Sequence, residues 1–521
     1  MPGILSPQAV RQSLLARDEI ALIDLREEAP FALSHPLFAA QLSAGRMEIE
    51  ILDRVPRKDA RIVLYDNGEG LAEGAAAKLE ALGYSDVNLL DGGVGGWEAA
   101  GYELFQDVNS YSKAFGELVE HRRGTPSLPA QEVRRLIEEK ANIRILDVRR
   151  FDEYETMSIP TGTSVPGAEL VLRAPSAAPD QDTTIIVNCA GRTRSIIGTQ
   201  SLINAGLPNR IFALRNGTIG WTLAGQSLEM SQTRSIPLPD VADIETARAR
   251  AREVSYRAGV KHVGRAGLSA LARVATRTLY RFDVRDPAEY RAGRLPGFRN
   301  APGGQLVQET DMFAPVRGAR IVLADNLGPR ADMTASWLAQ MGWEVYVLDE
   351  ELSGSLDTGD AAPTLPAIPD VASIDAAALS EILKDGRMVL IDLATSKAHQ
   401  AGHIPGARFA LRVELAQILA GLPAGSLPVL TDERGHLSCF AAAELGDPKV
   451  AVLKGGTQAW IDAGLPVAKG LENALSEPRD RYKRPYEGTS NSEAAMQAYL
   501  DWEYGLVEQL RRDGTHGFFV I

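Results

Sequence analysis

Four stretches of this 521-residue chain repeat one pattern of strand-ending residues at nearly constant spacing, and this repeat limits the fold more than any other feature. In each stretch an apolar run ends in aspartate, at Asp24, Asp147, Asp283 and Asp392. A second apolar run ends 42, 42, 42 and 40 residues later, at Asp66, Cys189, Asp325 and Asp432. We call these last four residues the cradle positions. Unrelated segments would not keep this register, so the sequence predicts four copies of one module.

The predicted strands are continuous apolar runs rather than alternating ones, as in Ile62–Tyr65 and Ile185–Val187. Such runs suit strands that are buried on both faces, as in a parallel sheet covered by helices. Helical patterns at residues 71–82 and 332–341 follow the cradle positions, and a glycine suited to a helix C-terminus closes each. The sequence therefore predicts an α/β fold with four tandem modules, each a mainly parallel sheet flanked by helices.

Polar and proline-containing segments divide the repeat. The predicted modules cover residues 1–108 (first), 125–232 (second), 255–358 (third) and 370–470 (fourth), and residues 471–521 form a C-terminal tail. The intervening segments 107–129, 231–243 and 353–373 are expected to be linkers, and the last is the most linker-like of the three. Within the tail, residues 493–512 have helical spacing of apolar side chains, and we expect this helix to pack against a module or a subunit partner.

Composition excludes several classes of function. A formal net charge of −13 argues against a nucleic-acid partner. No apolar stretch approaches the ~20 residues that a membrane helix needs, and the start of the chain lacks the parts of a signal peptide. Two cysteines argue against a disulfide framework and suggest a reducing cytoplasm. No Cys/His cluster has metal-ligand spacing, so we expect neither metal nor cofactor.

Cys189 differs from the other three cradle residues because a thiolate is a nucleophile. It ends an apolar run, a short loop follows, and a helical stretch starts near Ile196. Loop N–H groups at a helix N-terminus stabilise a negative charge, and Arg192 and Arg194 add two cations in the same loop. Such a setting favours the thiolate. An inert buried cysteine is the alternative, and the two arginines argue against it.

The repeat resembles the rhodanese module of sulfurtransferases over residues 1 to about 470. The resemblance rests on Asp147-Val-Arg149, the loop Cys189–Arg194, the turn Asn216–Trp221 and the segment Gly402–Ala407. It implies that Cys189 takes sulfane sulfur from a donor such as thiosulfate, releases sulfite, becomes a persulfide, and passes the sulfur to cyanide or a thiol. The substrate-binding residues that it implies are Ala190, Gly191, Arg192, Thr193, Arg194 and Arg215.

The other modules have aspartate in place of the nucleophile, so Asp66, Asp325 and Asp432 mark them as inactive. The resemblance implies tandem pairs, the first module with the second and the third with the fourth. The chain also departs from the family. Glu153 stands six residues after Asp147, where two-module rhodaneses carry a substrate-binding arginine.

The sequence leaves two other kinds of function to consider. Phosphatases of a related fold place Cys and Arg around a five-residue gap, but here Ser195 stands at the arginine position, which disfavours that reaction. A persulfide relay or binding scaffold with a protein sulfur acceptor stays open, as do 3-mercaptopyruvate as donor and a homodimer.

Several prominent residues are expected to have structural roles. Asp147 and Arg149 recur in modules without a nucleophile. His403 is expected in a hydrogen-bonded turn and Cys439 in a core. The tryptophans are expected to be packing anchors at Trp97, Trp221 and Trp460.

Overall fold

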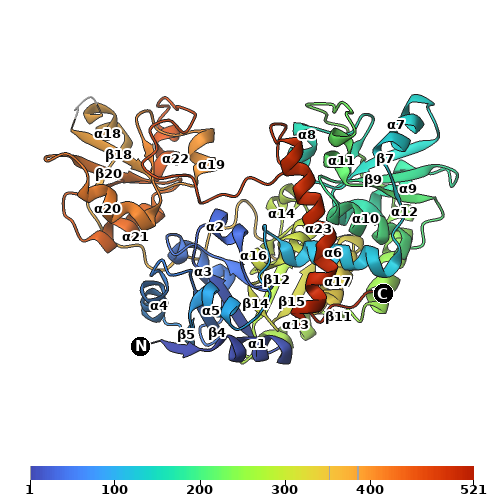
Figure 1. Cartoon of the computed structure of the whole chain (residues 1–521), viewed down its shortest axis with the longest axis horizontal. Coiled ribbons are helices and arrows are strands. Elements are labelled where there is room, and N and C mark those ends of the chain that lie inside the picture. The colour runs from blue at the N-terminus through green and yellow to red at the C-terminus, as the bar shows by residue number, and fades with distance from the viewer. Residues whose placement is uncertain (1, 351, 384–386) are drawn as a thin grey trace.

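The computed structural model describes residues 2–350, 352–383 and 387–521, and these residues contain four mainly parallel sheets flanked by helices (Figure 1). The predicted fold class is confirmed. The second sheet has the order β6-β10-β9-β7-β8, and the third and fourth have the same order in their own strands. The second sheet contains β6 (Ser127–Leu128), β7 (Ile143–Asp147), β8 (Thr163–Ser164), β9 (Thr184–Asn188) and β10 (Ile211–Leu214).

The remaining strands follow the repeat. The first module has β1 (Gly3–Leu5), β2 (Ile20–Asp24), β3 (Ala40–Gln41), β4 (Arg61–Tyr65) and β5 (Val87–Leu90). The third has β11 (Lys261–Val263), β12 (Leu279–Asp283), β13 (Arg299–Asn300), β15 (Arg320–Ala324) and β16 (Glu344–Leu348). The fourth has β17 (Ser373–Ile374), β18 (Met388–Asp392), β19 (Arg408–Phe409), β20 (Leu427–Thr431) and β21 (Ala451–Leu453). The central strands are buried, which explains their continuous apolar sequence.

One helix follows each cradle position and covers the sheet. These helices are α4 (Ala72–Ala81), α10 (Thr193–Asn204), α17 (Pro329–Gln340) and α21 (His436–Leu445). The predicted ranges 71–82 and 332–341 are close to α4 and α17. The third helix starts earlier than its apolar pattern because Pro329 occupies its first turn, where no N–H is needed.

Two of the three predicted linkers are wrong in one respect, because the first contains a long helix and the second ends in the start of another. Residues 110–123 form α6, whose first ten residues are buried, and residues 241–257 form α12. Helix α6 packs against α10 and the tail helix α23 (Glu493–Asp513), and α12 packs against α17. The sequence did not predict these helices, because their residues are largely polar and the elements that they pack against belong to other modules. The module boundaries themselves stay a prediction.

The modules pack against one another in pairs that differ from the predicted ones. Strand β14 (Val316–Arg317) of the third module runs antiparallel to β2 of the first and extends its sheet, with Val316 opposite Ala21. Beside it, the Glu19 carboxylate accepts hydrogen bonds from the N–H of Thr278 at 2.9 and 3.0 Å. The third module therefore pairs with the first, and the predicted pairing of the third with the fourth is wrong.

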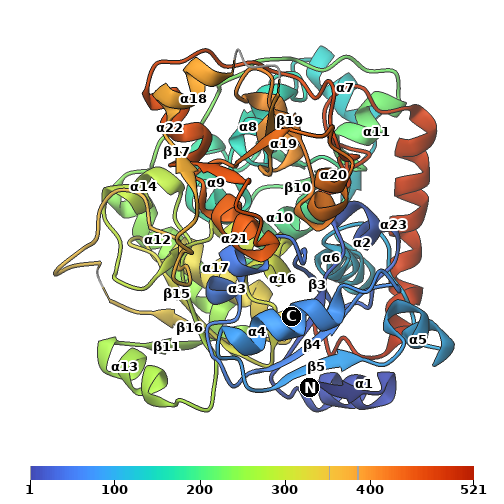
Figure 2. The same ribbon diagram turned by 90° about the vertical axis from the view of Figure 1, so that its left-hand side faces the viewer.

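The fourth module stands apart at one end of the molecule (Figure 1). Its Arg412 pairs with Glu48 of the first module at 2.8 Å, and Lys78 of the first module reaches Glu444 at 2.8 Å. Helix α21 packs against α3 (Met47–Arg54), an arrangement that Figure 2 shows from the side. Ion pairs and the packing of Ile49 against the fourth core thus hold the fourth module on the first.

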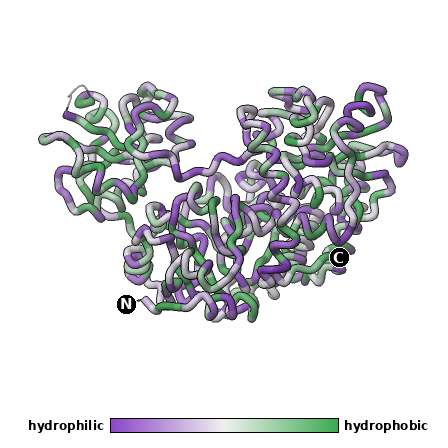
Figure 3. Tube along the Cα trace, viewed as in Figure 1, coloured by the Kyte–Doolittle hydropathy of each residue, from purple (hydrophilic) through white to green (hydrophobic). Residues whose placement is uncertain are grey.

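The C-terminal tail returns from the fourth module to the second. Its polar segment crosses the space between them, where Figure 3 shows a hydrophilic stretch, and α23 then runs down the outside of the molecule. The expectation of a tail helix at residues 493–512 is confirmed. The helix packs on α6 and on α11 (Gly217–Leu223) of the second module.

A fragment of residues 1–235 tests this interlocking. Deleting the third module removes β14 and uncovers the apolar core that the first and third modules share, so the fragment should aggregate. Size-exclusion chromatography and soluble yield, compared with the full chain, check this. A soluble, monodisperse fragment would contradict it.

Candidate active site

Cys189 lies at the carboxyl end of β9, in the loop that leads into α10. Cys189 is only 1% exposed. Helix α10 begins at Thr193, three residues before the expected start near Ile196, so Arg194 belongs to its first turn. The first N–H groups of the helix therefore lie close to the thiol along the chain.

In the other three modules the cradle carboxylate occupies a nest of backbone N–H groups. Asp66 accepts from the N–H groups two, five and six residues further on, at 2.9, 2.6 and 3.2 Å. Asp325 accepts at the same offsets, at 3.1, 3.0 and 3.4 Å. Asp432 accepts two, three and six residues further on, at 3.3, 3.1 and 2.9 Å. Each module is therefore built to hold an anion at this point.

The corresponding N–H groups of the second module belong to Gly191, Arg194 and Ser195. The Cys189 thiol donates to Ser195 Oγ at 3.4 Å. Burial raises the pKa of the Cys189 thiol, while the charge of Arg194 and the bonds from Ser195 act in the opposite direction. The N–H groups of Gly191, Arg194 and Ser195 can stabilise a negative charge on an atom bonded to the Cys189 sulfur.

Arg194 is paired with Glu153, whose two carboxylate oxygens accept from the guanidinium at 2.8 and 2.9 Å. Burial opposes ionisation of Glu153, but Arg194 outweighs it and holds the pKa of Glu153 at about 2. The third module repeats the pair as Arg330 and Glu289, 2.5 Å apart. The pair is thus common to a module with the thiol and one without it, which indicates that it orients the arginine.

The Arg192 guanidinium binds residues of α6 and α23. It donates to Glu117 at 2.7 and 2.8 Å and also pairs with Glu120. It lies over the Tyr504 ring, 4.1 Å from the centroid. These contacts anchor the loop, and a direct contact with substrate stays a prediction for Arg192.

The other predicted site residues are divided between the loop and the surface. Ala190 is buried under the tail, and Thr193 Oγ1 donates to the Glu503 carboxylate at 3.4 Å. Arg215 is exposed and donates to Ser127 Oγ at 3.1 Å, so the structure ties it to β6. A substrate contact for Arg215 stays a prediction.

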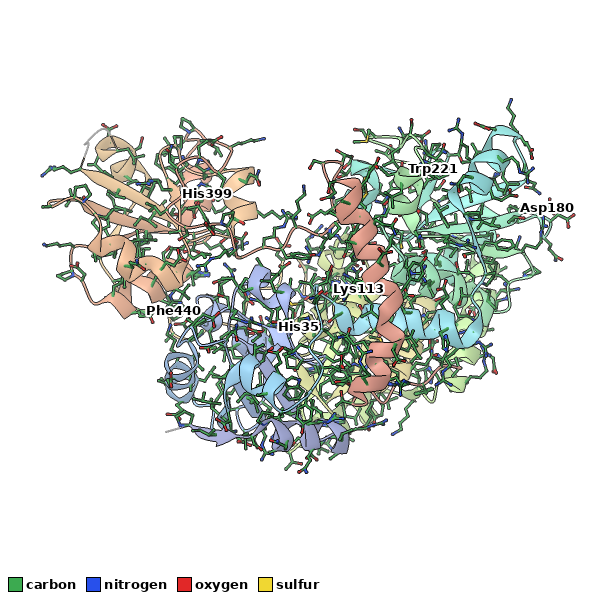
Figure 4. All side chains as sticks on the ribbon, in the orientation of Figure 1. His35, Lys113, Asp180, Trp221, His399 and Phe440 are labelled. Carbon is green, nitrogen blue, oxygen red and sulfur yellow. The ribbon has the colours of Figure 1, made fainter. Side chains whose placement is uncertain are left out.

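The C-terminal tail covers the Cys189 loop, which the sequence analysis did not predict. A side chain at Gly191 would place its Cβ 3.1 Å from the Tyr499 ring and 3.4 Å from a Glu503 oxygen. Glycine at this position leaves room for the close approach of α23. Figure 4 marks Lys113 where α6 and α23 cross, and its ammonium lies 5.0 Å from the centre of the Tyr499 ring.

Glu503 is the buried acidic residue of α23 where this helix covers the Cys189 loop. It is fully buried, and the Tyr499 hydroxyl donates to its Oε1 at 2.7 Å. Its Oε2 has no hydrogen-bond partner among the residues that the structure describes. Burial and the nearby Glu117 raise the pKa of Glu503 to about 8. The sequence did carry a signal, because Glu503 falls seven residues after Met496, on the apolar stripe of the helix.

The strand-ending aspartates make structural contacts. Asp147 pairs with Arg149 at 2.8 Å, and in the fourth module Asp392 instead pairs with His399 at 2.7 Å. His403 bonds to the His399 carbonyl at 2.8 Å, and Cys439 is half-buried against the fourth core. Each tryptophan donates to a carbonyl six residues on, at 3.0, 2.9 and 2.8 Å, from Trp97, Trp221 and Trp460.

Comparison with known families decides the identity of the repeat. The Rhodanese-like domain matches four segments, at residues 6–100, 129–224, 270–355 and 375–463. The chain belongs to the rhodanese family. A search of curated proteins found no match.

One solved structure supports this assignment over the whole chain. The crystal structure of a thiosulfate sulfurtransferase from Pseudomonas aeruginosa is 56% identical, covers 100% of both chains and superposes with a TM-score of 0.97. The chain is thus a rhodanese-type sulfurtransferase. A rhodanese-related protein from Thermoplasma volcanium is 26% identical, over 19% of this chain and 99% of its own, with a TM-score of 0.18.

Among the residues that the structure describes, no helix is long and apolar enough to cross a membrane. The same residues contain no group of three or more His, Cys, Asp or Glu side chains arranged to hold a metal ion.

Replacing Glu503 by glutamine tests the buried carboxyl. The folded protein holds this proton up to a pH of about 8, whereas the unfolded chain releases it near 4.5, so folding takes up a proton between these values. Stability therefore falls as pH rises through this window. We expect the loss of Tm between pH 6 and 8.5 to be smaller in Glu503→Gln than in the unmodified protein. Glu508→Gln, on the exposed face of the same helix, is the control. An equal loss in all three proteins would refute this role.

Proposed function

We propose that Cys189 carries sulfane sulfur from thiosulfate to cyanide or a thiol, as a persulfide, and that sulfite is released in the first step. The likeness to the Pseudomonas aeruginosa thiosulfate sulfurtransferase supports the donor. The position of Cys189 at the nest of Gly191, Arg194 and Ser195 supports the nucleophile. The resemblance to the rhodanese family implies sulfur transfer through a cysteine persulfide, and the residues around Cys189 are suited to this chemistry.

The first step is attack of the Cys189 thiolate on the outer sulfur of thiosulfate. A bond forms between the two sulfurs, the bond to the sulfonate sulfur breaks, and sulfite leaves with the electron pair. The remaining persulfide is an anion. Nest N–H groups and the Arg194 charge stabilise it without needing to reorganise. Because burial raises the pKa of the free thiol, this anion stabilisation is needed for reaction near neutral pH.

The observation that carries the proposal is the carboxylate in each of the other nests. Asp66, Asp325 and Asp432 show an anion bound by backbone N–H groups at the cradle position. The second module has a neutral, nucleophilic side chain at that position, so its nest serves an anion that forms during the reaction. We assign the other three modules to architecture, with their own carboxylates closing their nests.

Finer points of function follow from the same reasoning. We place the reaction in the cytoplasm, because a persulfide cycle needs a reduced cysteine. A protein sulfur acceptor, 3-mercaptopyruvate as the donor and a homodimer remain alternatives.

Cys189→Ser tests the nucleophile. The variant should form no persulfide and release no sulfite above background, because a hydroxyl cannot accept sulfane sulfur. Intact mass after thiosulfate treatment should show one added sulfur atom on the unmodified protein and none on the variant. Cys439→Ser, which removes the other cysteine, should retain both signals. Persulfide formation in Cys189→Ser would overturn the assignment.

Donor preference is a separate test. Thiosulfate carries two negative charges, and charge-assisted hydrogen bonds contribute about 1.5–3 kcal/mol each. The nest and Arg194 should therefore give thiosulfate a higher kcat/KM than 3-mercaptopyruvate. Steady-state kinetics with both donors and cyanide as the common acceptor checks this, and the reverse order would assign the site to the second donor.

A further inference from the structure

The nest of the fourth module contains a hydroxyl group as well as backbone N–H groups. Asp432 Oδ1 accepts a hydrogen bond from the Ser438 N–H at 2.9 Å and another from the Ser438 hydroxyl at 2.6 Å. Ser438 lies in the first turn of α21 and is fully buried. A hydrogen bond to a charged acceptor is shorter and stronger than one between neutral groups. The hydroxyl therefore adds a side-chain donor to the groups that hold the cradle anion.

Ser195 occupies the matching position of the second module. It follows Cys189 by six residues, which is the offset of Ser438 from the cradle position of its own module, and it lies in the first turn of α10. Ser195 is 1% exposed. The first and third modules have alanine at this offset, at Ala72 and Ala331. Because those nests form without a hydroxyl, Ser195 is not needed to build the nest around the nucleophile.

The two hydroxyls use their protons differently. Ser195 Oγ donates to the Arg192 carbonyl at 2.8 Å and accepts from the Cys189 thiol at 3.4 Å. The Ser438 hydroxyl donates to its carboxylate. The difference follows from the cradle group, because a thiol brings its own proton to the contact and a carboxylate brings none. Ser195 therefore accepts from Cys189 while the thiol keeps its proton.

Loss of the thiol proton lets the Ser195 hydroxyl reverse this contact. A hydroxyl has one proton, and rotation about the Cβ–Oγ bond can direct it to another acceptor. The Arg192 carbonyl also accepts from the Ile196 N–H at 3.1 Å, so it keeps a hydrogen bond after the rotation. Because a buried acceptor is costly when it is left unpaired, this second bond makes the rotation inexpensive.

The Asp432 carboxylate stands in for a persulfide at Cys189. Aspartate Cγ and cysteine Sγ are both bonded to Cβ, so a carboxylate oxygen occupies the place of the outer sulfur, one bond further on. The Ser438 hydroxyl reaches that oxygen. The hydroxyl of Ser195 thus has two acceptors during one reaction, which are Sγ of the thiolate before attack and the outer sulfur of the persulfide after it.

We propose that Ser195 is a catalytic residue whose hydroxyl turns from the Arg192 carbonyl to the sulfur anion at Cys189, first the thiolate and then the persulfide. This inference rests on the proposed sulfur transfer. The thiol proton leaves to water and none passes to Ser195, which forms a hydrogen bond and no covalent bond. The sulfur anion gains one donor beyond the backbone N–H groups, and the bonds that form and break with thiosulfate are those already described.

Two rate measurements on the full chain test this role, both in a Cys439→Ser background so that one thiol reacts. The first is single-turnover sulfite release from thiosulfate, and the second is alkylation by iodoacetamide, which needs no sulfur donor. In Ser195→Ala the thiolate loses a donor, so the midpoint of each pH–rate profile should rise by at least about one unit. Rates should then be about tenfold lower than in the unmodified serine protein below the midpoint and equal above it. Arg194 and Glu503, which also act on the charge of Cys189, are unchanged.

Two further variants separate this role from a structural one. Ser438→Ala removes the matching hydroxyl of the fourth module and should leave both profiles unchanged. Ser195→Thr keeps the hydroxyl, and its profiles should follow those of the serine protein. An alanine-like profile of Ser195→Thr, in a protein with an unchanged Tm, would overturn the inference.

The outcomes also distinguish this inference from the proposed function. Loss of packing alone would lower the rates of Ser195→Ala equally at every pH, and midpoints that do not move would overturn the inference while persulfide formation leaves the proposed function intact. If the serine protein forms no persulfide on Cys189, the proposed function and the inference fail together.

Discussion

The nest of backbone N–H groups between the cradle strand and the following helix is the feature on which the rest of this structure depends. Three modules fill it with their own carboxylate, and the bonds of 2.6–3.4 Å around Asp66, Asp325 and Asp432 join the strand to the helix that follows. The second module has a thiol there. The same backbone geometry thus serves stability in three places and, in our proposal, sulfur chemistry in one.

The two arginines near Cys189 are not a cluster of unpaired cations. Arg192 is held by Glu117 and Glu120, and Arg194 by Glu153. Each arginine is therefore fixed in direction and has a carboxylate partner, which avoids the desolvation cost that an unpaired guanidinium would incur. In our proposal, backbone dipoles act together with the Arg194 charge to stabilise the anion.

The packing of the modules against one another sets the position of the C-terminal tail. Strand β14 of the third module extends the first sheet, α12 packs on α17, and the fourth module sits on the first through Arg412 and Glu48. The tail can then return over the second module and bury Tyr499 and Glu503 against the loop. Modules that lack a nucleophile thereby determine what surrounds the one that has it.

The sequence by itself determined the repeat, the α/β modules, the position of Cys189 and the tail helix, because apolar periodicity and register are local properties of the chain. It also indicated a structural role for the Asp147–Arg149 pair, which recurs without the thiol. It did not reveal α6 and α12, whose polar sequences hide faces buried between modules, or the partners of Arg192, which come from α6 and the distant tail. The tertiary structure alone decided that the third module completes the first sheet and that α23 covers Gly191. Contacts between residues hundreds of positions apart depend on how whole modules pack, and a spacing pattern within one module carries no record of them.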